Sequence, residues 1–183
     1  MVLNNYLRGK IIVVIDAANL ESSVKSLKFW IDYTKLVKLF DGKSLVEIRD
    51  YCVHHGTKNQ NQFFTFLKKN GYKLVTKALK IIRAPELEKG DIRKANFDVE
   101  ITVDVLEMIR KFDTLVLFSG DSDFDYLIKH LRARGKRVIV ISTRYHISKE
   151  LIESSNKYID IRKLRKLIER KKKNKSPSFA TGN

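Results

Sequence analysis

Aspartates that follow apolar runs are the residues of this 183-residue chain best placed to do chemistry. Asp16 comes directly after KIIVVI (residues 10–15), and Asp121 and Asp123 come shortly after TLVLF (residues 114–118). Ligands of open α/β sheets bind beyond the carboxyl ends of the strands, so we expect these carboxylates at one sheet edge. Mg²⁺ takes oxygen ligands, often one or two carboxylates with water and phosphate. The pattern therefore predicts a Mg²⁺ or Mn²⁺ site.

A fourth aspartate, Asp98, stands at the start of a predicted helix over residues 97–112. At about 100° per residue, Asp98 falls on the apolar side of this helix, whereas Glu100 and Asp104 fall on a charged, solvated stripe. An aspartate in a first turn can also cap free backbone N–H groups. The same reservation applies to Ser122 and Asp125, which resemble a capping box.

The charge balance gives these acids a chemical context. The chain has 37 Lys and Arg against 21 Asp and Glu, a net charge of +16, which favours polyanions such as nucleic acid. Clustered carboxylates need a compensating cation, and a divalent ion beside a basic surface is the arrangement expected for phosphodiester hydrolysis. Such an ion would generate hydroxide from water and neutralise charge on the cleaved phosphate.

Half of the excess charge lies near the C-terminus. Residues 162–175 hold nine Lys or Arg and one Glu, a net charge of +8. Apolar residues at helical spacing predict a basic helix from residue 161, followed by a disordered tail over residues 171–183. The segment is either a solvated tail or an arm that grips phosphates. The expected nucleic-acid-binding residues are Lys94, Arg162, Lys163, Arg165, Lys166, Arg170, Lys171, Lys172 and Lys173.

The elements that must position the acids alternate between strand-like and helix-like patterns. Continuous apolar strands alternating with helices predict an α/β fold with a mainly parallel sheet covered on both faces. We expect one domain over residues 1–160 and the basic helix and tail over 161–183. The predicted strands are residues 10–15, 44–53, 114–118 and 137–141, with one strand or two over residues 72–82. The predicted helices are residues 33–40, 60–69, 97–112, 122–134 and 148–154.

The motifs resemble those of a known family. VIDAAN, FDVEITVD and LFSGDSDF followed by LRARGKRVIVIS are similar to the NYN-domain family, LabA-like branch, of the PIN-like nuclease superfamily. The resemblance covers residues 10–145. It implies a three-layer α/β/α sandwich and a metal-dependent site that cleaves RNA, single-stranded or structured. PIN-like domains often dimerise, so a homodimer stays open.

By position in these motifs, Asp16, Asp98, Asp121 and Asp123 match the family's catalytic and metal-binding acids. Asn19 and Ser119 are taken as supporting residues, Asn19 because it matches the motif asparagine that fixes the first loop. The family's Lys-Gly-hydrophobic-Asp run is interrupted here, and Lys94 becomes the nearest basic residue to the helix start.

Other functions remain alternatives. A non-catalytic RNA-binding or scaffold module would keep the same fold. A phosphatase that uses Asp16 as nucleophile is a further rival, although Ala18 stands where such enzymes carry a second aspartate. Cys52 with His54 and His55 could suggest zinc, but the paired ligands of a zinc site are missing. Phe63 and Phe66, three residues apart, are interpreted as core residues rather than as base-stacking ones.

Location follows from composition. A single cysteine cannot form an internal disulfide, which favours a reducing compartment and hence the cytoplasm. No apolar run approaches the roughly 18 residues of a membrane span, so no membrane partner is expected.

Overall fold

The computed structural model describes residues 3–78, 80–82, 92–94 and 96–171 of the chain. Its strands are β1 (Lys10–Asp16), β2 (Ser44–His54), β3 (Tyr72–Ala78), β4 (Lys80–Ile82), β5 (Ile92–Lys94), β6 (Thr114–Phe118), β7 (Arg137–Ser142) and β8 (Lys157–Asp160). Its α-helices are α1 (Ala17–Ser26), α2 (Tyr33–Lys38), α3 (Lys58–Lys69), α4 (Asp98–Glu107), α5 (Asp125–Ala133), α6 (Lys149–Ser154) and α7 (Arg165–Ile168). Two 3₁₀ turns, η1 (Ser122–Phe124) and η2 (Ile161–Leu164), precede α5 and α7.

Six strands form one sheet in the order β3-β2-β1-β6-β7-β8. Every neighbouring pair in this sheet is parallel. The chain runs outward from β1 through β2 to β3, then returns to the centre at β6 and runs outward the other way. The strand order therefore reverses between β1 and β6, and the crevice beyond such a switch point is where open α/β sheets bind ligands.

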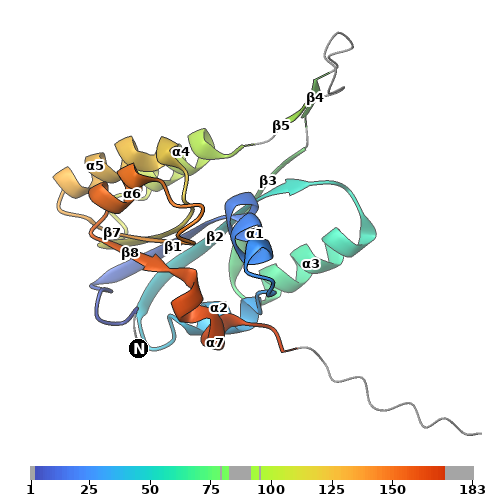
Figure 1. Cartoon of the computed structure of the whole chain (residues 1–183), viewed down its shortest axis with the longest axis horizontal. Coiled ribbons are helices and arrows are strands. Elements are labelled where there is room, and N and C mark those ends of the chain that lie inside the picture. Colours follow the sequence, from blue (N-terminus) through green and yellow to red (C-terminus); the bar gives the residue numbers. More distant parts are fainter. Residues whose placement is uncertain (1–2, 79, 83–91, 95, 172–183) are drawn as a thin grey trace, which may run out of the picture.

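Helices cover both faces of the sheet, which explains why β1 is continuously apolar between its ends, from Ile11 to Ile15. Ile11, Val13 and Ile15 pack into one core with α1, α2, α3 and α7, whereas Ile12 and Val14 pack into a second core with α4, α5 and α6. The two helical layers on either side of the sheet are visible in Figure 1. The predicted three-layer α/β/α sandwich with a mainly parallel sheet is confirmed.

The predicted basic helix is a 3₁₀ turn followed by a single α-helical turn, η2 and α7, packed onto the body of the protein. Ile161, Leu164 and Ile168 are fully buried in the first core, and Ile31 forms an isolated β-bridge with Glu169. The boundary at residue 160 stays a prediction. Apart from residue 171, the predicted tail lies outside the described residues.

The interpretation of Phe63 and Phe66 as core residues is wrong. Their exposed fractions are 36% and 40%, and the two rings stack on each other with centroids 6.3 Å apart. The reason is that α3 lies beside β3, the edge strand of the sheet, and buries only Leu67 of its residues. None of the helices in the described part of the chain is long and apolar enough for a bilayer crossing.

Candidate metal centre

The loops after β1 and β6 are joined by hydrogen bonds at the switch point. The Ser119 hydroxyl donates to Asp16 Oδ2 at 3.3 Å and accepts from the backbone N–H of Asp121, also at 3.3 Å. Asn19 Oδ1 accepts from the backbone N–H of Gly120 at 3.0 Å. Asn19 and Ser119, expected as supporting residues, thus hold the two acidic loops against each other.

Asp16 has a structural task besides its place at the site. Its Oδ1 accepts from the backbone N–H of Asn19 at 3.2 Å, and this caps the N-terminus of α1. Burial is the main cause that raises the pKa of Asp16, and the charge of Asp121 adds to it. Both oxygens of this carboxylate are therefore already engaged by the protein.

Asp98 is not a helix cap. The residue before α4, Phe97, makes no side-chain capping bond, and Asp98 instead accepts from the Asn96 side-chain amide at 2.6 Å. Burial raises the pKa of Asp98 to about 6, with further contributions from the charges of Asp121, Asp16 and Asp123 against an opposing one from Lys77. This half-buried carboxyl therefore faces other acids with little compensation from the protein.

Asp121 and Asp123 complete the acidic group. Asp121 caps η1 by accepting from the backbone N–H of Asp123 at 3.1 Å. The capping box expected from Ser122 and Asp125 is not formed: the residue before α5 makes no side-chain cap, and Asp125 pairs with Lys129 at 2.7 Å. The acidity of this loop thus exceeds what the start of the helix uses.

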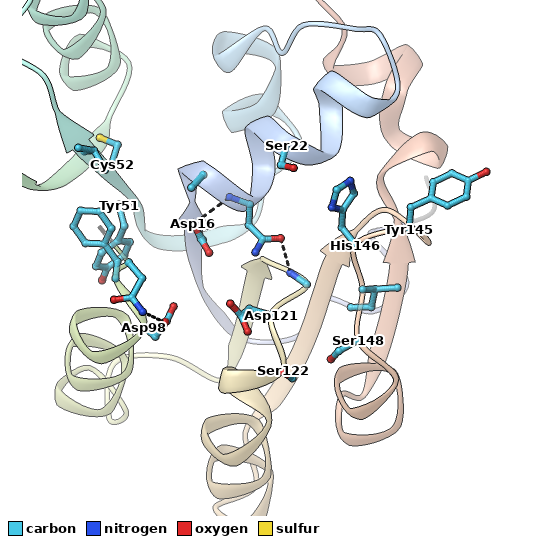
Figure 2. Close-up of a pocket in the computed structure, with 17 residues that line it drawn as sticks. Asp16, Ser22, Tyr51, Cys52, Asp98, Asp121, Ser122, Tyr145, His146 and Ser148 are labelled. Atoms are coloured by element: carbon cyan, nitrogen blue, oxygen red, sulfur yellow. Dashed lines mark hydrogen bonds between the residues drawn. The ribbon is translucent and has the colours of Figure 1, made fainter. Parts of the chain in front are cut away.

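Three of the four predicted acids come together as a potential ligand set. Carboxylate oxygens of Asp98, Asp121 and Asp123 lie within 4.8 Å of one another, and Asp123 is exposed. Among the described residues this is the one group of three such ligands. Asp16 lies outside the trio and lines the same pocket as Asp98 and Asp121. In Figure 2 the carboxylates of Asp16, Asp98 and Asp121 approach a common space from separate elements.

This donor set fits a hard divalent cation. All three donors are carboxylate oxygens, and opposite ligands of an octahedral Mg²⁺ lie about 4.2 Å apart. The oxygen spacing of up to 4.8 Å is therefore close to what one ion requires. A cation would also relieve the mutual repulsion that raises the pKa of Asp98. Burial raises the pKa of the Cys52 thiol to about 12, which disfavours the thiolate that zinc would need.

A pocket of about 580 Å³ surrounds the acids. Its apolar side includes Tyr51 and Phe97, both buried, whose rings meet edge to face with centroids 6.0 Å apart. Its opposite side is formed by the loop after β7, which was not predicted to be part of the site. The signal was present, since this loop also follows the carboxyl end of an apolar strand. The lining residues missed from the sequence are Ser22, Tyr51, Val53, Tyr145, His146, Ile147 and Ser148, and Cys52, considered above only for zinc, lines the pocket as well.

Gly120 brings the loop after β7 against the acidic loop. The backbone N–H of Ser148 donates to the Gly120 carbonyl at 3.0 Å. A Cβ on Gly120 would lie 2.0 Å from the carbonyl oxygen of His146, a separation that atoms cannot adopt. Glycine is therefore required here so that the two loops can touch.

Asp104 stands apart from the site. Its Oδ2 accepts from the Tyr51 hydroxyl at 2.8 Å and pairs with Arg49 at 2.7 Å. Glu100 similarly pairs with Lys77 at 2.7 Å. The prediction that this stripe of α4 is solvated is wrong for Asp104, because its side chain is 25% exposed and is bound by Arg49 of β2, whereas Glu100 keeps 41% of its side chain exposed.

The predicted basic residues fall into three groups. Arg162 pairs with Asp160 and Arg165 with Glu169, so two of the charges are partly neutralised. The exposed residues outside these two pairs are Lys163, Lys166, Arg170 and Lys171. Lys94 belongs to β5, but its side chain lies outside the described part, as do the whole of Lys172 and Lys173.

A second buried carboxyl, Asp50, lies on β2 next to the site. It is 1% exposed, and its Oδ1 has no hydrogen-bond partner among the described residues. Burial, followed by the charges of Glu21 and Asp16, raises its pKa to about 7. It points into the core opposite to that of Tyr51, since neighbouring residues of a strand face opposite sides.

The chain resembles known proteins both in sequence and in structure. The NYN domain model matches residues 10–165. The chain is 29% identical over 165 residues to the low amplitude and bright protein LabA of Synechococcus elongatus, covering 88% of this chain and 89% of that one. It is 34% identical over 97 residues to an uncharacterised protein of Methanocaldococcus jannaschii, 50% of this chain and 38% of the other. A crystal structure of a Vibrio parahaemolyticus protein of unknown function superposes with a TM-score of 0.70 and 25% identity, covering 85% and 96% of the two chains.

Proposed function

The chain belongs to the NYN-domain family, in its LabA-like branch, and from this premise we propose that it is a metal-dependent ribonuclease that hydrolyses RNA phosphodiester bonds. The observation that carries the proposal is the trio of carboxylates from Asp98, Asp121 and Asp123 within 4.8 Å. This trio lies at the switch point of the sheet, where open α/β sheets generally bind ligands. The resemblance of the motifs to the PIN-like nuclease superfamily supports the same residues as the catalytic acids.

Each acid has a distinct part in the proposal. Asp98, Asp121 and Asp123 hold a Mg²⁺ or Mn²⁺ ion, and Asp16 faces it from the end of β1. When bound, the ion lowers the pKa of water to supply hydroxide and neutralises charge on the phosphate. The hydrogen bonds from Asn19 and Ser119 keep the two loops in register, so the spacing of the acids is set before RNA arrives.

The basic surface supplies the affinity for RNA in this proposal. Exposed Lys and Arg around and beyond α7 contact the phosphate backbone, which is sequence-independent and sensitive to salt. The net charge of +16 therefore brings the polyanion to a pocket that is itself acidic.

The test is a cleavage assay on labelled RNA and DNA with Mg²⁺ or Mn²⁺. We expect the wild type to cleave RNA and Asp121→Asn to lose about 100-fold or more, since charge stabilisation by a bound metal is worth several kcal/mol. Asp125→Asn is the matched control, because that nearby aspartate pairs with Lys129 and should leave the rate unchanged.

Two outcomes would contradict the proposal. If Asp121→Asn cleaves as fast as the wild type, the acids are not the site. If the wild type binds RNA in a salt-dependent manner without turnover under any metal, the chain is a non-catalytic RNA-binding module. An assay with p-nitrophenyl phosphate tests the phosphatase alternative, which requires Asp16 as nucleophile; Asp16→Asn should then abolish turnover.

A further inference from the structure

An exposed tyrosine stands at the rim of the acidic pocket. Tyr145 lies in the loop between β7 and α6, lines the pocket with part of its surface, and is 63% exposed. Figure 2 shows its ring directed away from Asp121, beyond the pocket wall. A large aromatic ring left in solvent beside a site is the kind of residue that recognises a ligand.

The ring is held by a neighbouring cation. The Arg144 guanidinium lies over it, 4.6 Å from the centroid, and Arg144 Nη2 donates to the Tyr145 hydroxyl. One face of the ring is thus covered by a positive charge, while most of the side chain stays open to solvent. This arrangement orients the ring in advance, so little side-chain entropy is lost when a planar group stacks on it.

A buried carboxylate lies near this arginine and binds a second one. Asp160, 8% exposed, makes a two-pronged pair with the Arg162 guanidinium at 2.9 and 2.6 Å and lies close to the backbone N–H of Arg144. Arg144, Tyr145 and Arg162 therefore form one unit, here named the rim cluster. It combines an aromatic face with two guanidinium groups, which bind phosphates well.

The rim cluster is also fixed relative to the acids. The hydrogen bond from Ser148 to Gly120 and the close approach of His146 to Gly120 lock the rim loop onto the loop that carries Asp121. A nucleotide stacked on Tyr145 would therefore lie at a defined place beside the phosphate in the acidic pocket.

We propose that Tyr145 is a base-stacking residue for single-stranded RNA and that Arg144 and Arg162 contact the phosphates next to the stacked base. The inference rests on the proposed function for the identity of the nucleic acid. Aromatic rings stack on any base, so the subsite would hold RNA without sequence preference. Single strands are the fitting partner because the bases of a duplex are stacked on each other and cannot reach the ring.

Binding without turnover tests the proposal. Fluorescence anisotropy in EDTA would measure the affinity for a labelled adenosine hexanucleotide and for the same ribose-phosphate chain without bases. The loss of a stacked base by alanine substitution predicts binding of the adenosine oligomer that is about 5- to 150-fold weaker for Tyr145→Ala. Tyr145→Phe keeps the ring and should bind within about twofold of the wild type.

Two comparisons make the test specific. Tyr126→Ala, at a tyrosine of α5 that is 79% exposed, should bind like the wild type and is the matched control. The oligomer without bases should bind wild type and Tyr145→Ala equally, since only phosphate contacts remain. Circular dichroism of each variant checks that the fold is intact.

The outcomes separate this inference from the proposed function. Equal binding of the adenosine oligomer by wild type and Tyr145→Ala overturns the inference, and so does a wild type that does not distinguish the two oligomers or binds neither. A wild type that shows the Tyr145-dependent preference but cleaves no RNA with any metal supports base stacking while overturning the nuclease. Cleavage that depends on Asp121, with no effect of Tyr145→Ala on binding, supports the nuclease and overturns base stacking by Tyr145.

Discussion

Asp50 offers a prediction about stability that is independent of RNA and metal. Its carboxyl group is buried on β2, faces the charges of Glu21 and Asp16, and has its pKa raised from 3.8 to about 7. The folded protein therefore holds this proton more tightly than the unfolded chain does. The unfolding free energy falls as the pH rises from about 4 to about 7, and the loss is complete above that range.

The magnitude follows from the pKa difference. One pKa unit corresponds to about 1.4 kcal/mol, so about 3 kcal/mol is lost between pH 5 and pH 8 through Asp50 alone. Asp50→Asn removes the titration but leaves a buried amide, which costs about 1–3 kcal/mol at either pH. Relative to the wild type the variant should thus gain about 3 kcal/mol between pH 5 and pH 8, and it should be the more stable of the two near pH 8.

Urea unfolding at the two pH values measures the effect. We expect the wild type to lose about 3 kcal/mol more than Asp50→Asn on going from pH 5 to pH 8. Asp41→Asn, at an exposed aspartate, should show the same pH dependence as the wild type. Parallel pH profiles for the wild type and Asp50→Asn would refute the reasoning, because the buried carboxyl would then titrate as it does in the unfolded chain.

Two further predictions concern Asp104 and the C-terminal lysines. Asp104→Asn should lower the unfolding free energy by about 1–3 kcal/mol, because Arg49 and Tyr51 lose a charged acceptor, and should leave cleavage unchanged; a large loss of cleavage in a folded variant would place Asp104 in the site. Ending the chain after Lys171 removes three lysines, so the slope of log K against log salt should fall by up to about 2 for single-stranded RNA; an unchanged slope would assign those lysines to solubility.

The central part of the fold was predictable because continuous apolar runs leave few alternatives. Ile11 to Ile15 alternate between two cores, and that pattern requires helices on both faces. The helix α1 was missed because its buried residues are few and small, with only Leu20 and Val24 as larger ones. Asp16 is a typical N-cap residue and does cap α1, but it was interpreted only as a metal ligand, so the start of this helix was not recognised. The strand β8 was missed because it has only four residues, Lys157–Asp160.

Only part of the candidate site could be predicted from the sequence. The helical position of Asp98 predicted that it faces the body of the protein, and it is half-buried beside the other acids. The residues that face Asp98 depend on the strand order, which the sequence does not show. The order places the loop after β6 against the start of α4. Tyr145 was not anticipated, since nothing in the sequence around it shows that Asp160 lies close to the neighbouring Arg144.

The site is divided between two separately packed parts of the molecule. Asp98 is the first residue of α4, which packs on the sheet through Ile101 and Val105 in the second core. Asp121, in contrast, follows β6 at the centre of the sheet. An ion ligated from both sides would be a cross-link between helix and sheet. At 100 times its dissociation constant it would add about 2.7 kcal/mol to the unfolding free energy. The melting temperature would then report metal affinity directly, with neither RNA nor turnover in the experiment.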